Sequence, residues 1–327
     1  MSAQGAPLPD TACESMHLAL AGCDTLGEGL LWDPVGQQWW WTDIAASTVQ
    51  CWPAADTPQL RYFLPERVGS LARCRSGRML LGLAKRLCLA DPRQARSQQP
   101  WAVRTLVDVE AGEARTCVND GRTDRRGYFV FGSMNEMADG AARGAFYQYS
   151  LQHGLRRLSL PPVAIANSIC FSLDGATMYF TDTPTRRIMQ CDYDAESAQI
   201  GRIRLFAEMD AAHAYPDGSV VDADGCLWNA QWGAARVVRY APDGTVLRRI
   251  AVPALNPTCP AFGGPSMRQL CVTTARQDMN AVSLANMPQT GSLFTFEPGD
   301  TTGVLDALFD DLASPFYQER PWIPSFP

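Results

Sequence analysis

The sequence has few histidines and no closely spaced cysteines. Only His17, His153 and His213 occur in 327 residues, and the eleven cysteines are never closer than ten residues, so no CxxC pair exists. A zinc site made of thiolates would have to gather residues from distant parts of the chain, and a histidine cluster or a Ser-His-Asp triad would depend on one of the three histidines. Most of the cysteines are expected to be small, buried apolar side chains.

Long apolar runs and an excess of basic charge are missing as well. No apolar run approaches the ~20 residues of a membrane-spanning helix, and the first 14 residues show no pattern of a secretory signal. With 46% hydrophobic and 19% charged residues the chain is not disordered, and a net charge of -6 argues against nucleic acid and anionic membranes as partners. We therefore expect a folded cytoplasmic protein.

Helical periodicity is nearly absent, and residues 304–312 (VLDALFDDL) form the one short helix that the pattern predicts. The dominant pattern is a repeat of turns that contain Gly or Pro, each followed by β-rich segments. One glycine marks each unit, at steps of 41, 50, 48, 50 and 39 residues: Gly36, Gly77, Gly127, Gly175, Gly225 and Gly264. A period of roughly 40–50 residues with several short strands per unit predicts a β-propeller.

Six such units account for nearly the whole chain, so the predicted fold is an all-β, six-bladed propeller in a single domain over residues 15–314. Seven blades are the structural alternative. Residues 1–14 and the Pro-rich residues 315–327 are predicted to be tails. We expect the ring to close by pairing of the segment Met16–Ala21 with the last blade, because closure removes exposed sheet edges.

Three polar residues interrupt the apolar pattern where each leads into the first strand of its blade: Glu28, Asn167 and Asp217. Each has a simple alternative role as a turn residue, and Pro-Asp-Gly at 216–218 is a common turn sequence. Loops at one end of a propeller converge on the central channel, where three oxygen ligands with a summed charge of -2 would suit a hard divalent cation. The sequence therefore predicts a central metal site.

Several segments in order resemble the senescence-marker protein/regucalcin/gluconolactonase family of metal-dependent lactonases. They cover roughly residues 20–300 and include LGEGLLWDPVGQQWWWTDI, VNDGRTDRRGYFVFGSMN, ANSICFSLDGATMYFTDT, YPDGSVVDADGCLWNAQWGAARVVRY and PTCPAFGGPSMRQLCVTTAR. The resemblance implies a six-bladed propeller with one divalent metal ion in the channel. It also implies that Glu28, Asn167 and Asp217 are the metal ligands.

The same resemblance implies the substrate contacts. Asn119 corresponds to an asparagine that faces metal or substrate, and Glu136 to a glutamate that binds sugar hydroxyls. The family commonly has Arg-x-Asn-Asp-Gly where this chain has Cys117-Val118-Asn119-Asp120-Gly121, so Cys117 stands in place of a substrate-binding arginine. Arg115 is the nearest other arginine in this segment, and either residue is a candidate for that position.

The expected activity is hydrolysis of a sugar lactone, such as a glucono-, galactono-, xylono- or arabinonolactone, to the aldonic acid, with Asp217 as proton acceptor. The alternatives are a promiscuous metal-dependent esterase or phosphotriesterase, and a calcium-binding propeller without turnover. Oxygen ligands are compatible with calcium, magnesium, manganese, ferrous iron or zinc. The expected partner is a small sugar lactone, and the expected oligomeric state is a monomer.

Overall fold

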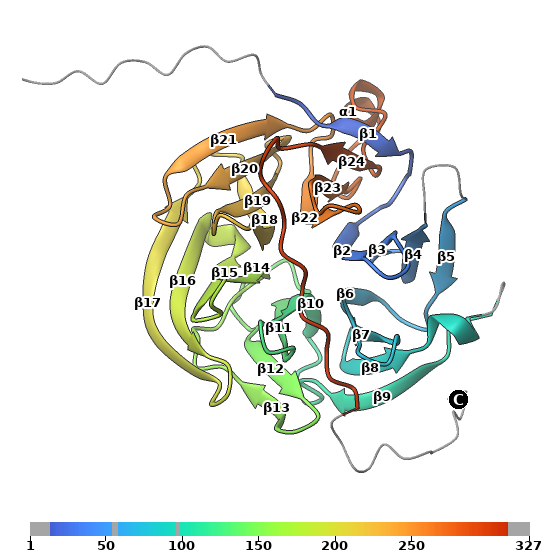
Figure 1. The fold of residues 1–327 in the computed structure, drawn as a ribbon, viewed down its shortest axis with the longest axis vertical. Helices are drawn as coiled ribbons and strands as arrows, with labels where there is room; N and C mark the ends of the chain where they lie inside the picture. Colours follow the sequence, from blue (N-terminus) through green and yellow to red (C-terminus); the bar gives the residue numbers. More distant parts are fainter. Residues whose placement is uncertain (1–13, 54–57, 96–98, 313–327) are drawn as a thin grey trace, which may run out of the picture.

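Six four-stranded antiparallel sheets stand around a central channel in the computed structural model, which describes residues 14–53, 58–95 and 99–312 (Figure 1). Neighbouring innermost strands contact each other all the way round, in the order β2, β6, β10, β14, β18, β22 and back to β2. The prediction of an all-β propeller with six blades is confirmed, and the seven-bladed alternative is wrong.

Each blade contributes one innermost strand, two middle strands and one outermost strand. The innermost strands are β2 (Gly27–Asp33), β6 (Val68–Arg73), β10 (Thr116–Thr123), β14 (Ala166–Phe171), β18 (Tyr215–Val221) and β22 (Pro257–Gly263). The second strands are β3 (Gln38–Asp43), β7 (Met79–Leu83), β11 (Phe129–Asn135), β15 (Thr177–Asp182), β19 (Leu227–Trp232) and β23 (Gln269–Thr274). The third strands are β4 (Thr48–Trp52), β8 (Arg86–Ala90), β12 (Phe146–Ser150), β16 (Arg187–Asp194), β20 (Arg236–Tyr240) and β24 (Leu293–Phe296). The outermost strands are β5 (Leu60–Phe63), β9 (Val103–Asp108), β13 (Gly154–Arg157), β17 (Gln199–Glu208), β21 (Val246–Ala251) and β1 (His17–Leu20).

The two ends of the propeller sequence meet in the sixth blade. Strand β1 pairs antiparallel with β24, which places an N-terminal strand on the outside of the last blade. The predicted closure of the ring by Met16–Ala21 is therefore confirmed. Glu14 also belongs to the fold, because its carbonyl accepts a hydrogen bond of 2.8 Å from the N–H of Ala251. Residues 1–13 and 313–327, which hold nearly all of the two predicted tails, lie outside the described residues.

The hydrophobic core is divided into six clusters, each between two neighbouring blades. Between the first two blades, for example, Trp40 of β3 shares a cluster with Leu71 of β6 and Leu81 of β7. Middle strands such as β7, whose five residues MLLGL are all buried, have both faces covered and read as continuous apolar runs. Nine of the ten described cysteines are buried and all ten are free, as expected for small apolar side chains.

The glycines that mark the repeat lie in the hairpin turns between the innermost and second strands. Five of them, from Gly77 to Gly264, have φ between 73° and 86°, a left-handed conformation that glycine adopts without strain. In the first blade Gln37, with φ of 50°, takes this conformation in place of Gly36. The sequence period therefore reports one hairpin turn per blade.

The predicted helix at 304–312 is wrong, because this segment is extended and crosses the end of the channel (Figure 1). Its backbone is bonded to the blades: Gly303 N–H donates to the carbonyl of Met267, and Phe309 N–H to that of Arg73. Phe309 is fully buried, and its ring stacks on Tyr149 at 6.0 Å. The apolar spacing that suggested a helix thus comes from anchor residues of an extended segment.

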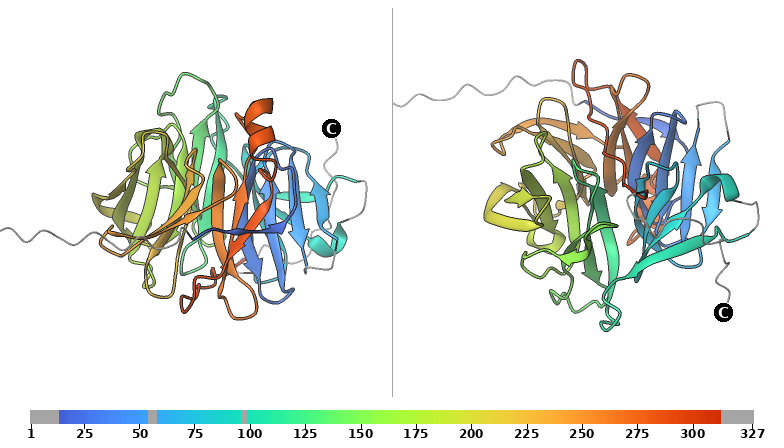
Figure 2. Two further views of the ribbon diagram at one scale, coloured as in Figure 1. Left: turned by 90° about the horizontal axis from the view of Figure 1, so that it is seen from above. Right: turned by 60° about the horizontal axis from the view of Figure 1, so that its bottom comes forward.

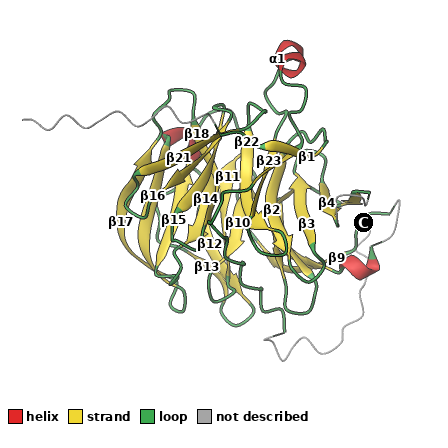
Figure 3. Cartoon of the chain, turned by 45° about the horizontal axis from the view of Figure 1, so that its top comes forward, coloured by secondary structure: helices red, strands yellow, loops and turns green. Residues whose placement is uncertain are grey.

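The one α-helix of the described residues, α1 (Ala281–Asn286), stands between β23 and β24 and projects from one end of the ring (Figures 2 and 3). Its first turn is capped by Asn280, whose side chain accepts a hydrogen bond of 2.9 Å from Ser283 N–H. None of the helices in the described part of the chain is long and apolar enough to cross a membrane.

Candidate functional site

All six innermost strands shift register near their beginning. The pairing with the second strand slips in every blade, for example between Glu28 and Leu31 in β2 and between Asn167 and Cys170 in β14. Such a β-bulge leaves residues without a ladder partner and redirects their side chains. Because the bulge recurs at the same level of each blade, the side chains beside it can converge on the channel.

Four polar residues occupy the same position relative to the hairpin turn in four of these strands: Glu28, Asn119, Asn167 and Asp217. Gly69 holds this position in β6, and Thr258, which lies in the register shift of β22, is the nearest counterpart in the sixth blade. The six residues follow one another at steps of 41, 50, 48, 50 and 41. We call these six residues the channel ring. The sequence predicted the equivalence of Glu28, Asn167 and Asp217, and the structure adds Asn119 as a fourth polar member.

The four polar members of the channel ring line one cavity of about 280 Å³ at the end of the channel where the innermost strands begin. Its wider part is apolar, with Leu26, Ile44, Met134, Ile165, Tyr215 and Trp232 among the lining residues. Glu28, Asn167 and Asp217 are all less than 10% exposed. The structure therefore brings the three predicted ligands and Asn119 together at the bottom of a largely apolar pocket.

Three carboxylates interact in this site, those of the buried Glu28 and Asp217 and that of the half-buried Asp120. The pKa of Glu28 is raised well above its usual value, first by burial and then by the charges of Asp217 and Asp120. The pKa of Asp217 is raised in the same way, by burial and then by the charge of Asp120. Like charges this close are unfavourable unless a proton or a cation compensates them.

The two amides of the channel ring hold each other in place. Asn119 Nδ2 donates to Asn167 Oδ1 at 3.1 Å and to the carbonyl of Ala166 at 2.9 Å. Asn167 Nδ2 in turn donates to Thr183 Oγ1 at 3.0 Å. The orientation of the Asn167 amide is therefore fixed from both sides. Both N–H groups of Asn119 are engaged, so only its amide oxygen remains for a bound molecule.

The donor set fits a hard divalent cation. Asp217 Oδ1 is buried and has no hydrogen-bond partner, although a buried carboxylate oxygen normally has one. Carboxylate and amide oxygens are the ligands that calcium, magnesium and manganese prefer. The described residues contain no group of three or more His, Cys, Asp and Glu side chains arranged for a metal ion. A cation here would accordingly depend on the Asn167 amide as its third ligand.

A second cavity of about 170 Å³ adjoins the first and shares Leu26, Ile44, Asn119, Met134 and Gln277 with it. Cys117 and Glu136, the two other residues predicted to contact substrate, line this second cavity. Glu136 is ion-paired with Arg67, which lies at the start of β6 in the neighbouring blade. Arg115 is ion-paired with Asp139 and lines neither cavity, so it does not take the place of the arginine that the family has at position 117.

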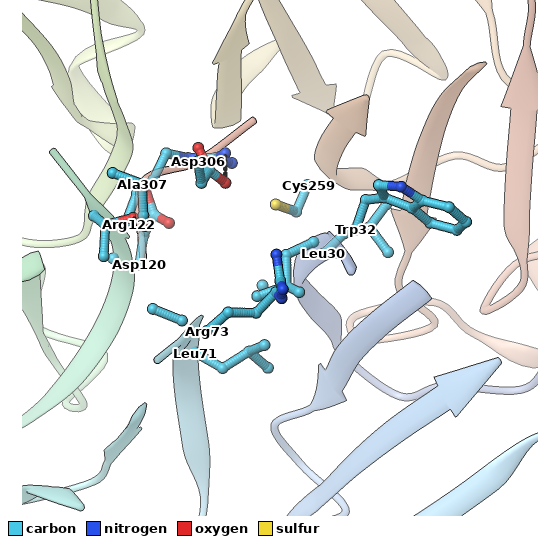
Figure 4. Close-up of a pocket in the computed structure, with 14 residues that line it drawn as sticks. Leu30, Trp32, Leu71, Arg73, Asp120, Arg122, Cys259, Asp306 and Ala307 are labelled. Carbon is cyan, nitrogen blue, oxygen red and sulfur yellow. Dashed lines mark hydrogen bonds and ion pairs between the residues drawn. The ribbon is translucent and has the colours of Figure 1, made fainter. Parts of the chain in front are cut away.

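The far end of the channel is closed by the extended C-terminal segment. Arg122 Nη1 and Asp306 Oδ2 form an ion pair of 2.8 Å there, and Thr123 Oγ1 donates to the carbonyl of Ala307 at 2.6 Å. A small cavity of about 30 Å³ remains between these residues and Leu30, Leu71, Arg73 and Cys259 (Figure 4). The channel is therefore open at the end that holds Glu28, Asn119, Asn167 and Asp217 and is closed at the opposite end by residues 303–312.

The sequence reasoning missed Asp120, Arg67 and the pair of Arg122 with Asp306. Asp120 stood beside Asn119 in the Asn-Asp-Gly motif, which was a usable signal. Arg67 lies 50 residues before Cys117, one blade repeat away, and a comparison of neighbouring units could have found it. Asp306 had no such signal, because its segment does not belong to any repeat.

Comparison with known proteins agrees with this fold. Residues 26–276 match the family described as SMP-30/gluconolactonase/LRE-like region, and the chain belongs to this family. An L-arabinolactonase from Azospirillum brasilense is 41% identical over 273 residues, which cover 83% of this chain and 88% of that protein. A putative sugar lactone lactonase from Rhizobium meliloti is 35% identical over 84% of this chain and 90% of its own length. The crystal structure of a calcium-binding protein, regucalcin, from Agrobacterium tumefaciens superposes with a TM-score of 0.81 at 29% identity, over 90% of this chain and 98% of that one.

Proposed function

We propose that this protein is a hydrolase of lactone ester bonds that opens an aldonolactone to its aldonic acid with the help of a divalent cation. The observation that carries the proposal is the channel ring, in which two carboxylates and two amides meet at the bottom of a pocket. The relatives named as sugar lactonases support the substrate class, since the chain aligns with most of their length.

Glu28, Asn167 and Asp217 are the residues that would hold the cation. When bound, a divalent cation supplies Lewis-acid polarisation of the lactone carbonyl. The protein provides an amide and two carboxylates already held in place. Asn167 is fixed by Asn119 and Thr183, and Glu28 Oε2 accepts a hydrogen bond of 3.1 Å from Gly29 N–H.

Asp217 is the proposed proton acceptor. Its carboxylate is buried and lines the pocket, where it can accept a proton from a water molecule beside the bound lactone. The carboxylate oxygen of Asp217 that does not hold the cation would take a proton from water as the water oxygen bonds to the carbonyl carbon. The same proton then passes to the ring oxygen as the bond between that oxygen and the carbonyl carbon breaks, and the aldonic acid leaves.

Asn119 supports this chemistry by position. Its amide nitrogen holds the Asn167 oxygen and its own oxygen is left for the substrate, where a hydroxyl group could donate to it. Leu26, Ile44 and Trp232 add apolar surface to the lining of the pocket, against which the carbon atoms of the lactone ring can pack. Glu136 in the adjoining cavity is an acceptor for sugar hydroxyls.

The regucalcin structure from Agrobacterium tumefaciens is described as a calcium-binding protein, and binding without turnover is the competing function for this chain. A panel of aldono-1,4- and 1,5-lactones in a pH-indicator assay separates the two. We expect acid release from at least one lactone, and loss of that activity in the presence of a chelator. Calcium binding without acid release from any lactone would leave a binding protein.

A further inference from the structure

We infer that Arg67 replaces, from the neighbouring blade, the substrate-binding arginine that the sequence lacks at Cys117, and that Arg67 and Glu136 together bind hydroxyl groups of the lactone. This inference rests on the proposed function. It makes Arg67 a specificity-determining residue for lactones that carry hydroxyl groups.

The repeat places Arg67 and Cys117 at the same level of adjacent blades. Each lies two residues before a member of the channel ring, Gly69 in β6 and Asn119 in β10. Leu26, Ile165 and Tyr215 hold this position in three other blades, and all of them line the first cavity. The residue at this position therefore lines one of the two cavities in at least five blades, and Arg67 is the one cationic residue among these five.

The backbone brings Arg67 against Cys117. A Cβ atom on Gly69 would lie 2.6 Å from the carbonyl oxygen of Val118 and 2.7 Å from that of Asn119, so only glycine allows β6 to approach β10 this closely. The carbonyl of Arg67 accepts a hydrogen bond from Ala84 N–H, and the carbonyl of Ala84 accepts one from Val118 N–H. Through these contacts the start of β6 is tied to the segment that carries Cys117.

The side chains complete the arrangement. The Arg67 guanidinium is ion-paired with Glu136, and Cys117 lines the same cavity as these two residues. Cys117 is buried and short, whereas an arginine at position 117 would extend toward Glu136 and compete with Arg67 for it. The cysteine thus leaves the space that the guanidinium of Arg67 uses.

The pair remains accessible to a ligand. The Arg67 side chain is 46% exposed and that of Glu136 is 26% exposed, and both line the second cavity beside Asn119 and Met134. A guanidinium only donates hydrogen bonds and a carboxylate only accepts them. Two neighbouring hydroxyls can satisfy both groups, one accepting from Arg67 and the other donating to Glu136, which selects a lactone with a vicinal diol.

The test compares a hydroxylated aldono-1,4-lactone with γ-butyrolactone, which has the same ring and no hydroxyl groups. In Arg67→Met the value of kcat/KM for the hydroxylated lactone should fall at least about tenfold, mainly through KM, while γ-butyrolactone is affected less than about twofold. Glu136→Gln should act in the same direction, and the double variant should lose less than the product of the two single losses. The matched control is Arg115→Met. Arg115 is ion-paired with Asp139 and lines neither cavity, so kcat/KM for both lactones should stay at the wild-type value.

Adding Cys117→Arg to the Arg67→Met variant is the second measurement. It returns a guanidinium to Glu136 from the next blade and should recover part of the lost kcat/KM. If folded Arg67→Met keeps the wild-type preference and wild-type KM, Arg67 is a surface ion pair only and the inference is wrong, while the lactonase function stands. If the wild-type protein hydrolyses no lactone at all, the proposed function fails and the inference fails with it.

Discussion

Arg122 and Asp306 form an ion pair of 2.8 Å although they are 184 residues apart in the sequence. Burial opposes the charge of Arg122, but the charge of Asp306 raises the pKa of Arg122 above its usual value. The pair joins the innermost strand β10 to the extended segment that closes the far end of the channel. The C-terminal segment is therefore part of the channel wall.

Removal of the Asp306 charge should destabilise the protein. Asp306→Asn leaves the largely buried Arg122 without its closest counter-charge, and we expect a loss of about 2–3 kcal/mol in the free energy of unfolding, measured by urea denaturation. The control is Asp310→Asn in the same segment, because Asp310 pairs with the mostly exposed Arg75 and should contribute less than about 1 kcal/mol. Equal losses in the two variants would mean that the buried pair has no special role.

The contribution of Asp24 to the free energy of unfolding should depend on pH. Burial raises its pKa to about 6, against hydrogen bonds of 2.8 Å from Gln50 Nε2 and Trp41 Nε1 that favour the charged form. Because the folded state holds this proton more tightly than the unfolded state, the stability contributed by Asp24 is complete below pH ~4 and is lost as the pH rises through about 6.

The measurement is the difference in unfolding free energy between the wild-type protein and Asp24→Asn as a function of pH. Relative to the variant, the wild-type protein should lose about 2–3 kcal/mol between pH 4 and pH 7. The asparagine cannot titrate, and the contributions of all other titratable groups are the same in both proteins, so they cancel in the difference. A difference that stays constant over this range would show that folding does not raise the pKa of Asp24.

Loss of a ligand should abolish metal-dependent turnover and leave the fold intact. Glu28→Gln removes one of the two ligand charges and Asn167→Ala removes the amide oxygen, yet both residues lie beside a bulge and outside the clusters between the blades. Lactone hydrolysis with saturating metal and thermal unfolding should be measured on the same preparations. Thr295→Val in β24 is the control, since the Thr295 hydroxyl bonds the carbonyl of Leu270 and the residue lines neither cavity. Activity that survives in both ligand variants would contradict the assignment.

Asp217→Asn should lower turnover more than it lowers metal occupancy. The amide still offers one oxygen to a cation, but it cannot accept a proton from water. Bound metal and kcat are to be determined on one sample, at several metal concentrations. If kcat falls only in proportion to the lost metal, Asp217 is a ligand and not the proton acceptor.

The sequence predicted the six blades because each blade needs one hairpin turn, and the glycines in these turns recur at a measurable period. It also predicted that Glu28, Asn167 and Asp217 lie together at the channel, because residues at equivalent positions of neighbouring blades face the same axis. The role that we infer for Arg67 in place of Cys117 could not be predicted from the sequence. It depends on how closely β6 and β10 pack at Gly69. The extended segment around Asp306 was mistaken for a helix because its anchor residues happen to follow a helical spacing.

The most direct test of the account is a metal titration of chelator-treated protein, followed by both bound metal and lactone hydrolysis. We predict that the stripped protein stays folded and inactive, and that activity returns in parallel with about one equivalent of bound divalent cation. Glu28→Gln and Asn167→Ala should bind that cation weakly and regain little activity. Full lactone hydrolysis by the stripped wild-type protein would contradict the claim that the channel ring acts through a bound cation.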